Sequence, residues 1–159
     1  MSLGLAGNNL FPRQVETESQ AAPSLIGVTS SLSIDQDLAN AWEDLTSMTA
    51  TFTLENDAFA FISFNGKFSS EDKGPNIKNE CIIVIDGVQK TITTRSHTNG
   101  NGTVDEFFLA TQTITELGMG THTIKIQGQT DIATDGDGVF NGGEMNIIMV
   151  DKTRVKRHG

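Results

Sequence analysis

Apolar and polar residues alternate along most of the chain beyond residue 33, which is the pattern of half-buried β-strands. The clearest example is residues 117–127, LGMGTHTIKIQ, where two glycines precede a strict alternation. A shorter apolar run follows at residues 145–150. A glycine turn that leads into an alternating strand, followed by a closing apolar strand, is typical of a β-sandwich.

The same analysis predicts further strands and the turns between them. The segment Asp86-Gly87 lies between two β runs and predicts a two-residue type I′ hairpin, which requires positive φ at both central positions. Residues 39–45 are expected to form a connector with one helical turn, and residues 69–79 and 95–101 exposed polar loops. The remaining predicted strands are 33–38, 48–54, 58–69, 80–85, 88–94 and 104–114. About eight strands without an amphipathic helix favour an all-β, antiparallel, jelly-roll-like β-sandwich.

Residues 1–33 differ from the rest of the chain. Their apolar side chains follow neither the helical nor the strand period, and alone they could not bury enough surface to offset the entropy of ordering. We therefore expect an extended N-terminal arm that docks on a neighbouring subunit or a larger assembly; the alternative is that it packs on its own domain. The residues expected to make the contact are Leu3, Leu5, Leu10, Phe11, Leu25 and Ile26.

The predicted domain organisation is an arm at 1–33, a sandwich at 34–151 and a basic tail at 152–159. The tail carries four cations, which indicate either a solvated terminus or an electrostatic contact with an acidic neighbour. The net charge of −9 over 159 residues argues against nucleic acid as a partner, because phosphate binding needs a basic face. No apolar run approaches the length of about 20 residues that spans a bilayer, so no membrane partner is expected.

The sequence contains little catalytic chemistry. The histidines His97, His122 and His158 are not at a metal-ligand spacing, and no nucleophile elbow or phosphate-binding loop is present. His122 alternates with threonines and is expected to be an exposed strand residue. The single cysteine, Cys81, cannot form an intramolecular disulfide and is interpreted as a small buried apolar residue. We expect no enzyme activity, no catalytic residues and no cofactor.

One segment has the composition of a cation site. Residues 131–144 partly match the EF-hand calcium loop, with Asp135, Asp137, Asn141 and Glu144 at ligand positions. Ala133 stands where the first carboxylate is needed, and the flanks are strand-like. Calcium binding and a plain exposed loop both remain open, and the loop is favoured. Similarly, Trp42 is expected to anchor the core or a strand edge rather than to stack on a sugar.

Several short motifs together resemble a known family of proteins. They are WEDL at 42–45, FAFISF at 59–64, IVIDG at 83–87, LGMGTHTIKI at 117–126 and NIIMV at 146–150. Over roughly residues 33–151 this arrangement resembles the jelly-roll modules of tailed-bacteriophage virion proteins. These modules serve as head decoration or cement proteins, head fibres and receptor-binding tail tips, and are often trimeric.

The resemblance implies a non-enzymatic structural protein of the virion. The expected role is a decoration protein on the capsid surface, made in the host cytoplasm, which stabilises the head through its N-terminal arm. The expected partners are the major capsid protein or other virion subunits and further copies of the chain, with a trimer favoured over a dimer. The alternative is a receptor- or glycan-binding module of a tail or head fibre.

Overall fold

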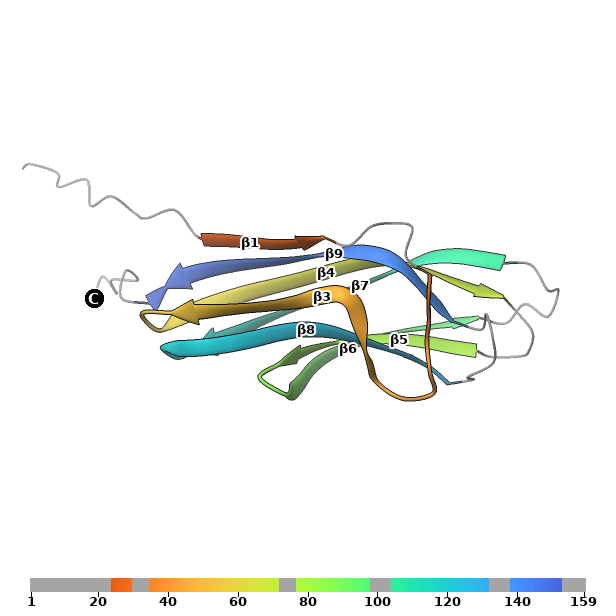
Figure 1. Cartoon of the computed structure of the whole chain (residues 1–159), viewed down its shortest axis with the longest axis horizontal. Helices are drawn as coiled ribbons and strands as arrows, with labels where there is room; N and C mark the ends of the chain where they lie inside the picture. The colour runs from red at the N-terminus through yellow and green to blue at the C-terminus, as the bar shows by residue number, and fades with distance from the viewer. Residues whose placement is uncertain (1–23, 30–34, 72–76, 98–103, 132–137, 153–159) are drawn as a thin grey trace, which may run out of the picture.

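The computed structural model describes residues 24–29, 35–71, 77–97, 104–131 and 138–152, and these residues form a sandwich of two antiparallel sheets (Figure 1). The described residues contain nine strands and no helix longer than a single turn. The strands are β1 (Ser24–Thr29), β2 (Gln36–Asp37), β3 (Glu43–Leu54), β4 (Ala58–Glu71), β5 (Ile77–Ile85), β6 (Val88–His97), β7 (Val104–Leu117), β8 (Gly120–Thr130) and β9 (Val139–Asp151).

The strand order defines a jelly roll. One sheet has the order β1-β9-β4-β7, with the short β2 also paired to β9, and the other has the order β3-β8-β5-β6. If β2 is set aside, the first strand pairs with the last, the second with the next to last, and so on inward to the hairpin of β5 and β6. This nested pairing is that of a long hairpin rolled into two sheets, which is the jelly-roll architecture. The predicted fold class is confirmed.

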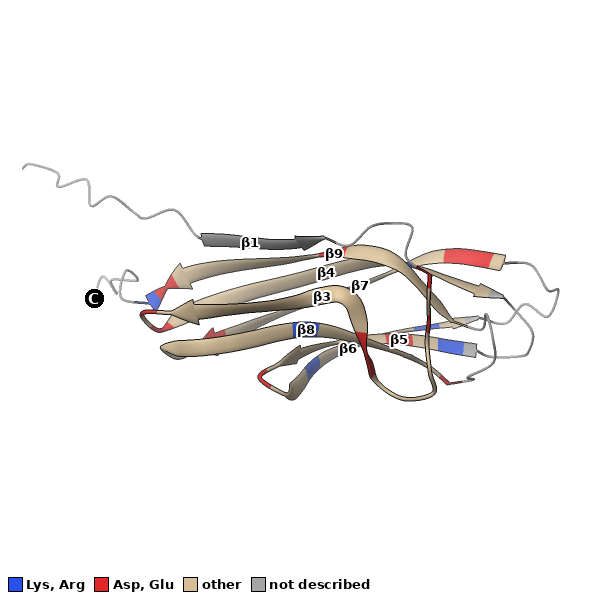
Figure 2. Cartoon of the chain, viewed as in Figure 1, with Lys and Arg blue, Asp and Glu red and all other residues tan. Residues whose placement is uncertain are grey.

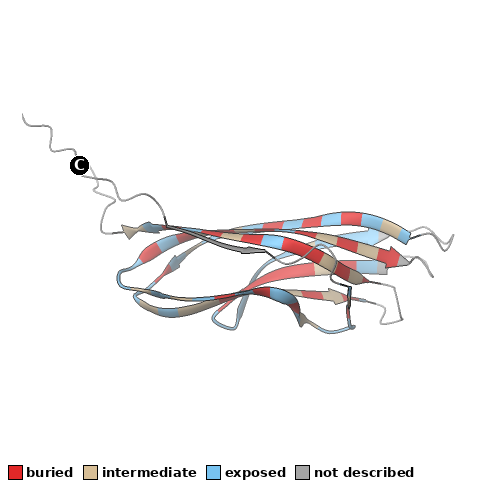
Figure 3. Cartoon of the chain, turned by 45° about the horizontal axis from the view of Figure 1, so that its top comes forward, coloured by how far each residue is buried: buried red, intermediate tan, exposed pale blue. Residues whose placement is uncertain are grey.

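The core lies between the sheets, and in β4, β7, β8 and β9 every second residue contributes most of it, whereas all five residues 81–85 of β5 are buried. The alternation of buried and exposed positions is visible along the long strands in Figure 3. Aromatic rings fill one part of this core, where the Phe68 centroid lies 5.3 Å from that of Phe140 and 6.0 Å from that of Phe107. Fully burying one such side chain contributes about 1.5–3 kcal/mol. The largest fully buried side chains are Leu45, Met48, Ile62, Phe64, Phe68, Ile82, Ile83, Ile124, Ile126, Phe140 and Met145.

A β-bulge in β9 allows both halves of that strand to contribute to the core. Phe68 is paired with Phe140 and Lys67 with Gly142, so Asn141 is an extra residue on β9. Gly142 has a φ of 118°, which side chains rarely adopt. Without the extra residue, Phe140 and Met145 would point to opposite faces, because side chains alternate along a strand. With it, both are fully buried.

Most predicted strands are present, and the hairpin at Asp86-Gly87 is confirmed, with φ of 49° and 80°. Four expectations were wrong. Residues 69–71 end β4 and residues 77–79 begin β5, so the expected loop at 69–79 is strand at both ends. Residues 43–45 begin β3 and do not form a helical turn; residues 95–97 continue β6, so His97 lies on a strand; and residues 139–144 belong to β9 rather than to a loop. In each case pairing with a neighbouring strand supplies backbone hydrogen bonds that a short polar stretch cannot supply by itself.

Residues 24–29, which the sequence analysis placed in the arm, form the edge strand β1. This strand pairs with β9 in the register Ser24 to Met149 through Thr29 to Glu144. The segment SLIGVT has adjacent apolar residues and a glycine, so it lacks the alternation that marks the other strands. Residues 1–23 lie outside the described residues.

Candidate interaction face on the five-stranded sheet

The outer surface of the five-stranded sheet carries a contiguous apolar area. Phe59 is paired with Val150, and Phe61 is paired with both Ile148 and Ile114, so the five side chains form adjoining rows across β9, β4 and β7. The exposed fractions are 70% for Ile114, 41% for Val150, 39% for Phe59 and 37% for Ile148, while Phe61 is half-buried. We refer to Phe59, Phe61, Ile114, Ile148 and Val150 as the outer apolar face.

Charged residues border this face at the end of the sandwich where β9 ends (Figure 2). Lys152 Nζ forms an ion pair with Glu116 and lies 5.4 Å from the centre of the Phe59 ring. On the side of the face away from Lys152, the adjoining row consists of the uncharged residues Asn146, Ser63 and Gln112. An apolar area bounded by charged residues at one end and by uncharged polar residues at the other is typical of a protein-binding surface.

Only part of the predicted arm lies in the described residues. Leu25 and Ile26 are on β1, where they are paired with Ile148 and Ile147. Leu3, Leu5, Leu10 and Phe11 lie outside the described residues. The structure therefore brings β1 next to the outer apolar face, a relationship that no local sequence pattern indicates.

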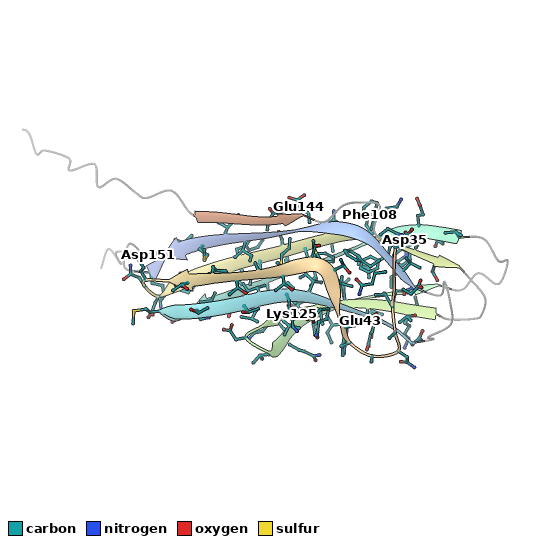
Figure 4. The ribbon with its side chains drawn as sticks, viewed as in Figure 1. Asp35, Glu43, Phe108, Lys125, Glu144 and Asp151 are labelled. Carbon is teal, nitrogen blue, oxygen red and sulfur yellow. The ribbon has the colours of Figure 1, made fainter. Side chains whose placement is uncertain are left out.

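The predicted calcium ligands are only partly described. Asp135 and Asp137 lie outside the described residues. Asn141 donates from Nδ2 to Asp35 Oδ1 at 2.9 Å, and Glu144 is exposed and accepts a hydrogen bond from Asn146 at 2.6 Å (Figure 4). The part of the chain that the structure describes contains no group of three or more His, Cys, Asp or Glu side chains that could hold a metal ion.

His122 is not the exposed strand residue that the sequence analysis expected. Its side chain is only 13% exposed, and both ring nitrogens are bonded, Nδ1 to Asp86 Oδ2 and Nε2 to the carbonyl oxygen of Gly118, each at 2.7 Å. Both partners are acceptors when Asp86 is ionised, so both hydrogen bonds form when the ring carries a proton on each nitrogen. The hydrogen bond that His122 donates to Asp86, and then the one that it donates to the carbonyl oxygen of Gly118, raise the pKa of His122. The same bond to His122 lowers the pKa of Asp86.

A small polar cluster is buried between the sheets at the end of the sandwich opposite to His122. Asn79 and Thr130 face each other across β5 and β8 and are fully buried. Among the described residues, Asn79 Nδ2 and Oδ1 and Thr130 Oγ1 have no hydrogen-bond partner. A Cβ at Gly138 would lie 2.2 Å from Asn79 Oδ1, so the close packing of the chain there requires glycine. Such unsatisfied buried groups lower the stability of the fold.

A shallow groove runs along the other border of the five-stranded sheet, where β6 approaches β7. Its lining includes the hydroxyl and amide side chains of Ser63, Asn65, Thr93 and Gln112. Phe108 lies two residues before the lining residue Ala110 on β7 and is 62% exposed (Figure 4). Polar groups beside an exposed ring are the components that a sugar-binding surface uses.

Trp42 is half-buried directly before β3, as expected for a residue at a strand edge. Cys81 is fully buried, which raises the pKa of its thiol to about 12. The described part of the chain contains no helix of sufficient length and hydrophobicity to cross a membrane.

The fold and its faces define a jelly-roll β-sandwich protein. No family model matches the chain, and no curated protein matches it. Among solved structures, a chain of the T13 IBDV viral particle superposes with a TM-score of 0.48 at 15% sequence identity. The match covers 94% of the present chain and 36% of that chain, so this protein spans about a third of its length.

Proposed function

We propose that the chain is a non-enzymatic structural virion protein, a decoration or cement protein that binds an assembled phage head through its N-terminal arm. The observation that carries the proposal is the outer apolar face, which lies on a jelly-roll body beside the strand that continues into the arm. The motifs at 59–64, 83–87 and 117–126, which resemble those of phage virion modules, support the same assignment.

The physical requirements of a cement protein agree with this arrangement. A packaged genome presses outward on the shell, so a stabilising protein must tie neighbouring subunits together. A rigid sandwich with an extended segment increases the contact area across a subunit boundary, and many copies on one shell add avidity. The net charge of −9 also suits docking of the body on basic patches of the shell. We further propose a location on the capsid surface and a homo-oligomer, with a trimer favoured.

The test is co-sedimentation with purified particles of the virus that encodes the chain. The full chain should travel with the particles through a density gradient and raise the temperature at which they release their genome. A variant that lacks residues 1–23 keeps β1 and should remain folded by circular dichroism, yet stay at the top of the gradient. Absence of the full chain from the particle fraction, or unchanged binding of the truncated variant, would contradict the proposal.

The second candidate is a glycan-binding module, and the groove beside Phe108 favours it. If this is the function, glycan-array screening of the full chain should identify a ligand, and Phe108→Ala should abolish the signal. Val104 lies on the same strand and is 58% exposed, so Val104→Ala is the matched control and should leave the signal unchanged. A decoration protein should bind no glycan in this screen.

A further inference from the structure

We propose that the outer apolar face binds residues 1–12 of a second copy of this chain, so that the copies exchange N-terminal segments. This inference rests on the proposed function, because it takes the N-terminal segment as the part of the chain that binds neighbouring subunits. It adds that the subunit bound is a second copy of this chain. The structural relationship behind it is the position of β1, whose first residues lie beside the outer apolar face. None of the described elements covers this face.

The face is suited to a chain segment without charge. Its central row consists of Ile148, Phe61 and Ile114, and the row toward the end of β9 contains Val150 and Phe59. Its ionic border, Lys152 with Glu116, is already paired within the chain. A bound segment with charged side chains would have to desolvate them without finding a free partner on the face, which is costly.

Residues 1–12 have the matching composition. They read MSLGLAGNNLFP and contain no charged side chain; the first is Arg13. Leu3, Leu5, Leu10 and Phe11 supply apolar surface that the segment cannot bury by itself. The chain therefore contains both an exposed apolar face and a short uncharged apolar segment.

The direction of β1 favours a second copy over the same copy. Because β1 is antiparallel to β9, the chain followed backward from Thr29 to Ser24 moves toward Met149 and the end of the sheet. Return to its own face would require a reversal within residues 13–22. Of the residues that most readily form tight turns, Gly, Pro, Asn, Asp and Ser, these ten, RQVETESQAA, contain only Ser19. From residue 12 to Ser24 an extended chain reaches roughly 40 Å, which is enough to reach an adjacent molecule.

The first experiment measures the mass of the full chain by light scattering over a range of concentrations. The wild type should self-associate, and Ile114→Glu should raise the dissociation constant at least tenfold. Ile92→Glu is the matched control, because Ile92 is 51% exposed on a strand of the other sheet and should leave association unchanged. Equal association of wild type and Ile114→Glu, or an equal loss in Ile92→Glu, would overturn the proposal.

The second experiment identifies the occupant. Full chains that carry the photo-reactive residue p-benzoylphenylalanine at position 114 are prepared with ¹⁴N and with ¹⁵N, mixed and irradiated. Cross-links between position 114 and residues 1–12 should include pairs of mixed isotope composition. Cross-links of unmixed composition alone would show that the segment folds back on its own copy, and cross-links to any other segment would show a different interface; either outcome overturns the proposal.

These two experiments use the purified chain alone, whereas the proposed function is tested with virus particles. Loss of particle binding with intact exchange would reject the decoration role and retain this inference. Particle binding without exchange would retain the decoration role and reject this inference.

Discussion

His122 and Asp86 form an ion pair in which Nδ1 lies 2.7 Å from Oδ2, and this contact joins the start of β8 to the turn between β5 and β6. Asp86 also accepts a hydrogen bond from the backbone N–H of Thr123 through its other oxygen, at 2.8 Å. A turn residue with a positive φ is thereby fixed to a neighbouring strand on the same sheet.

This pair predicts a pH-dependent stability. Because folding raises the pKa of His122, its contribution is present below the unfolded pKa of about 6.5 and is lost as the pH rises through the folded pKa. Because folding lowers the pKa of Asp86, its contribution is present above about pH 3.9 and is lost as the pH falls through the folded pKa. His122→Gln should therefore lower the free energy of unfolding by about 0.5–1 kcal/mol more at pH 5.5 than at pH 9, as measured by urea denaturation.

The control for this prediction is Asp86→Asn. Asparagine tolerates the positive φ and keeps an acceptor for Thr123, but it removes the charge that holds the proton on His122. The pH dependence that distinguishes His122→Gln from wild type should be reduced in this background. An identical destabilisation by His122→Gln at both pH values would contradict the ion-pair interpretation.

Gly143 is predicted to be intolerant of any side chain. A Cβ there would lie 2.8 Å from the carbonyl oxygen of Asn65 and 2.9 Å from the Cα of Gly66, and neither backbone atom can move without disturbing β4. Gly143→Ala should lower the free energy of unfolding by about 1–3 kcal/mol. Gly118→Ala is the control, because its Cβ would meet only Asp57 Oδ1, at 3.9 Å. Similar unfolding midpoints for the two variants would disprove the packing argument.

Two buried threonines are predicted to respond in opposite directions when replaced by valine. Thr130 Oγ1 has no partner among the described residues, whereas Thr111 Oγ1 donates to the carbonyl oxygen of Thr91 at 3.3 Å. Thr130→Val should raise the free energy of unfolding by about 1 kcal/mol, and Thr111→Val should lower it by a similar amount. Thermal and denaturant unfolding of both variants measure this difference. Destabilisation by Thr130→Val would mean that its hydroxyl is satisfied in solution.

Cys81 is predicted to be unreactive in the folded protein. Burial raises the pKa of its thiol to about 12, so the thiolate fraction at pH 8 is on the order of one in ten thousand. An aromatic disulfide reagent at pH 8 should release about one equivalent of thiol only after guanidinium is added. Rapid modification of the native protein would show that this part of β5 opens readily.

The regular strands and the tight turn were predictable because their signals are local. Asp86-Gly87 specifies a hairpin through backbone conformation alone, and the alternation at 121–127 specifies one buried and one exposed face. The edge strand β1 was missed for the corresponding reason. Its six residues lack alternation, and it is stabilised by backbone pairing with β9, which lies more than a hundred residues away in the sequence.

The candidate interaction face was only partly accessible to sequence reasoning. Phe59 and Phe61 stand out as apolar residues of a strong strand, but which aromatic residues point outward depends on register and on the sheet that covers the other side. The ion pair of His122 and Asp86 gave no sequence signal, because a histidine among alternating threonines resembles any exposed strand position. Its partner lies 36 residues away and approaches only when β8 pairs with β5.

The sequence by itself therefore determined an all-β sandwich, most of its strands and its tight hairpin, because side-chain alternation and backbone preference act within a few residues. Only the tertiary structure establishes the nested pairing of the first strand with the last, the outward position of the apolar face and the ion pair of His122 with Asp86. These features depend on contacts between distant strands, and a residue's own alternation pattern specifies a face of its strand but not the strand beside it.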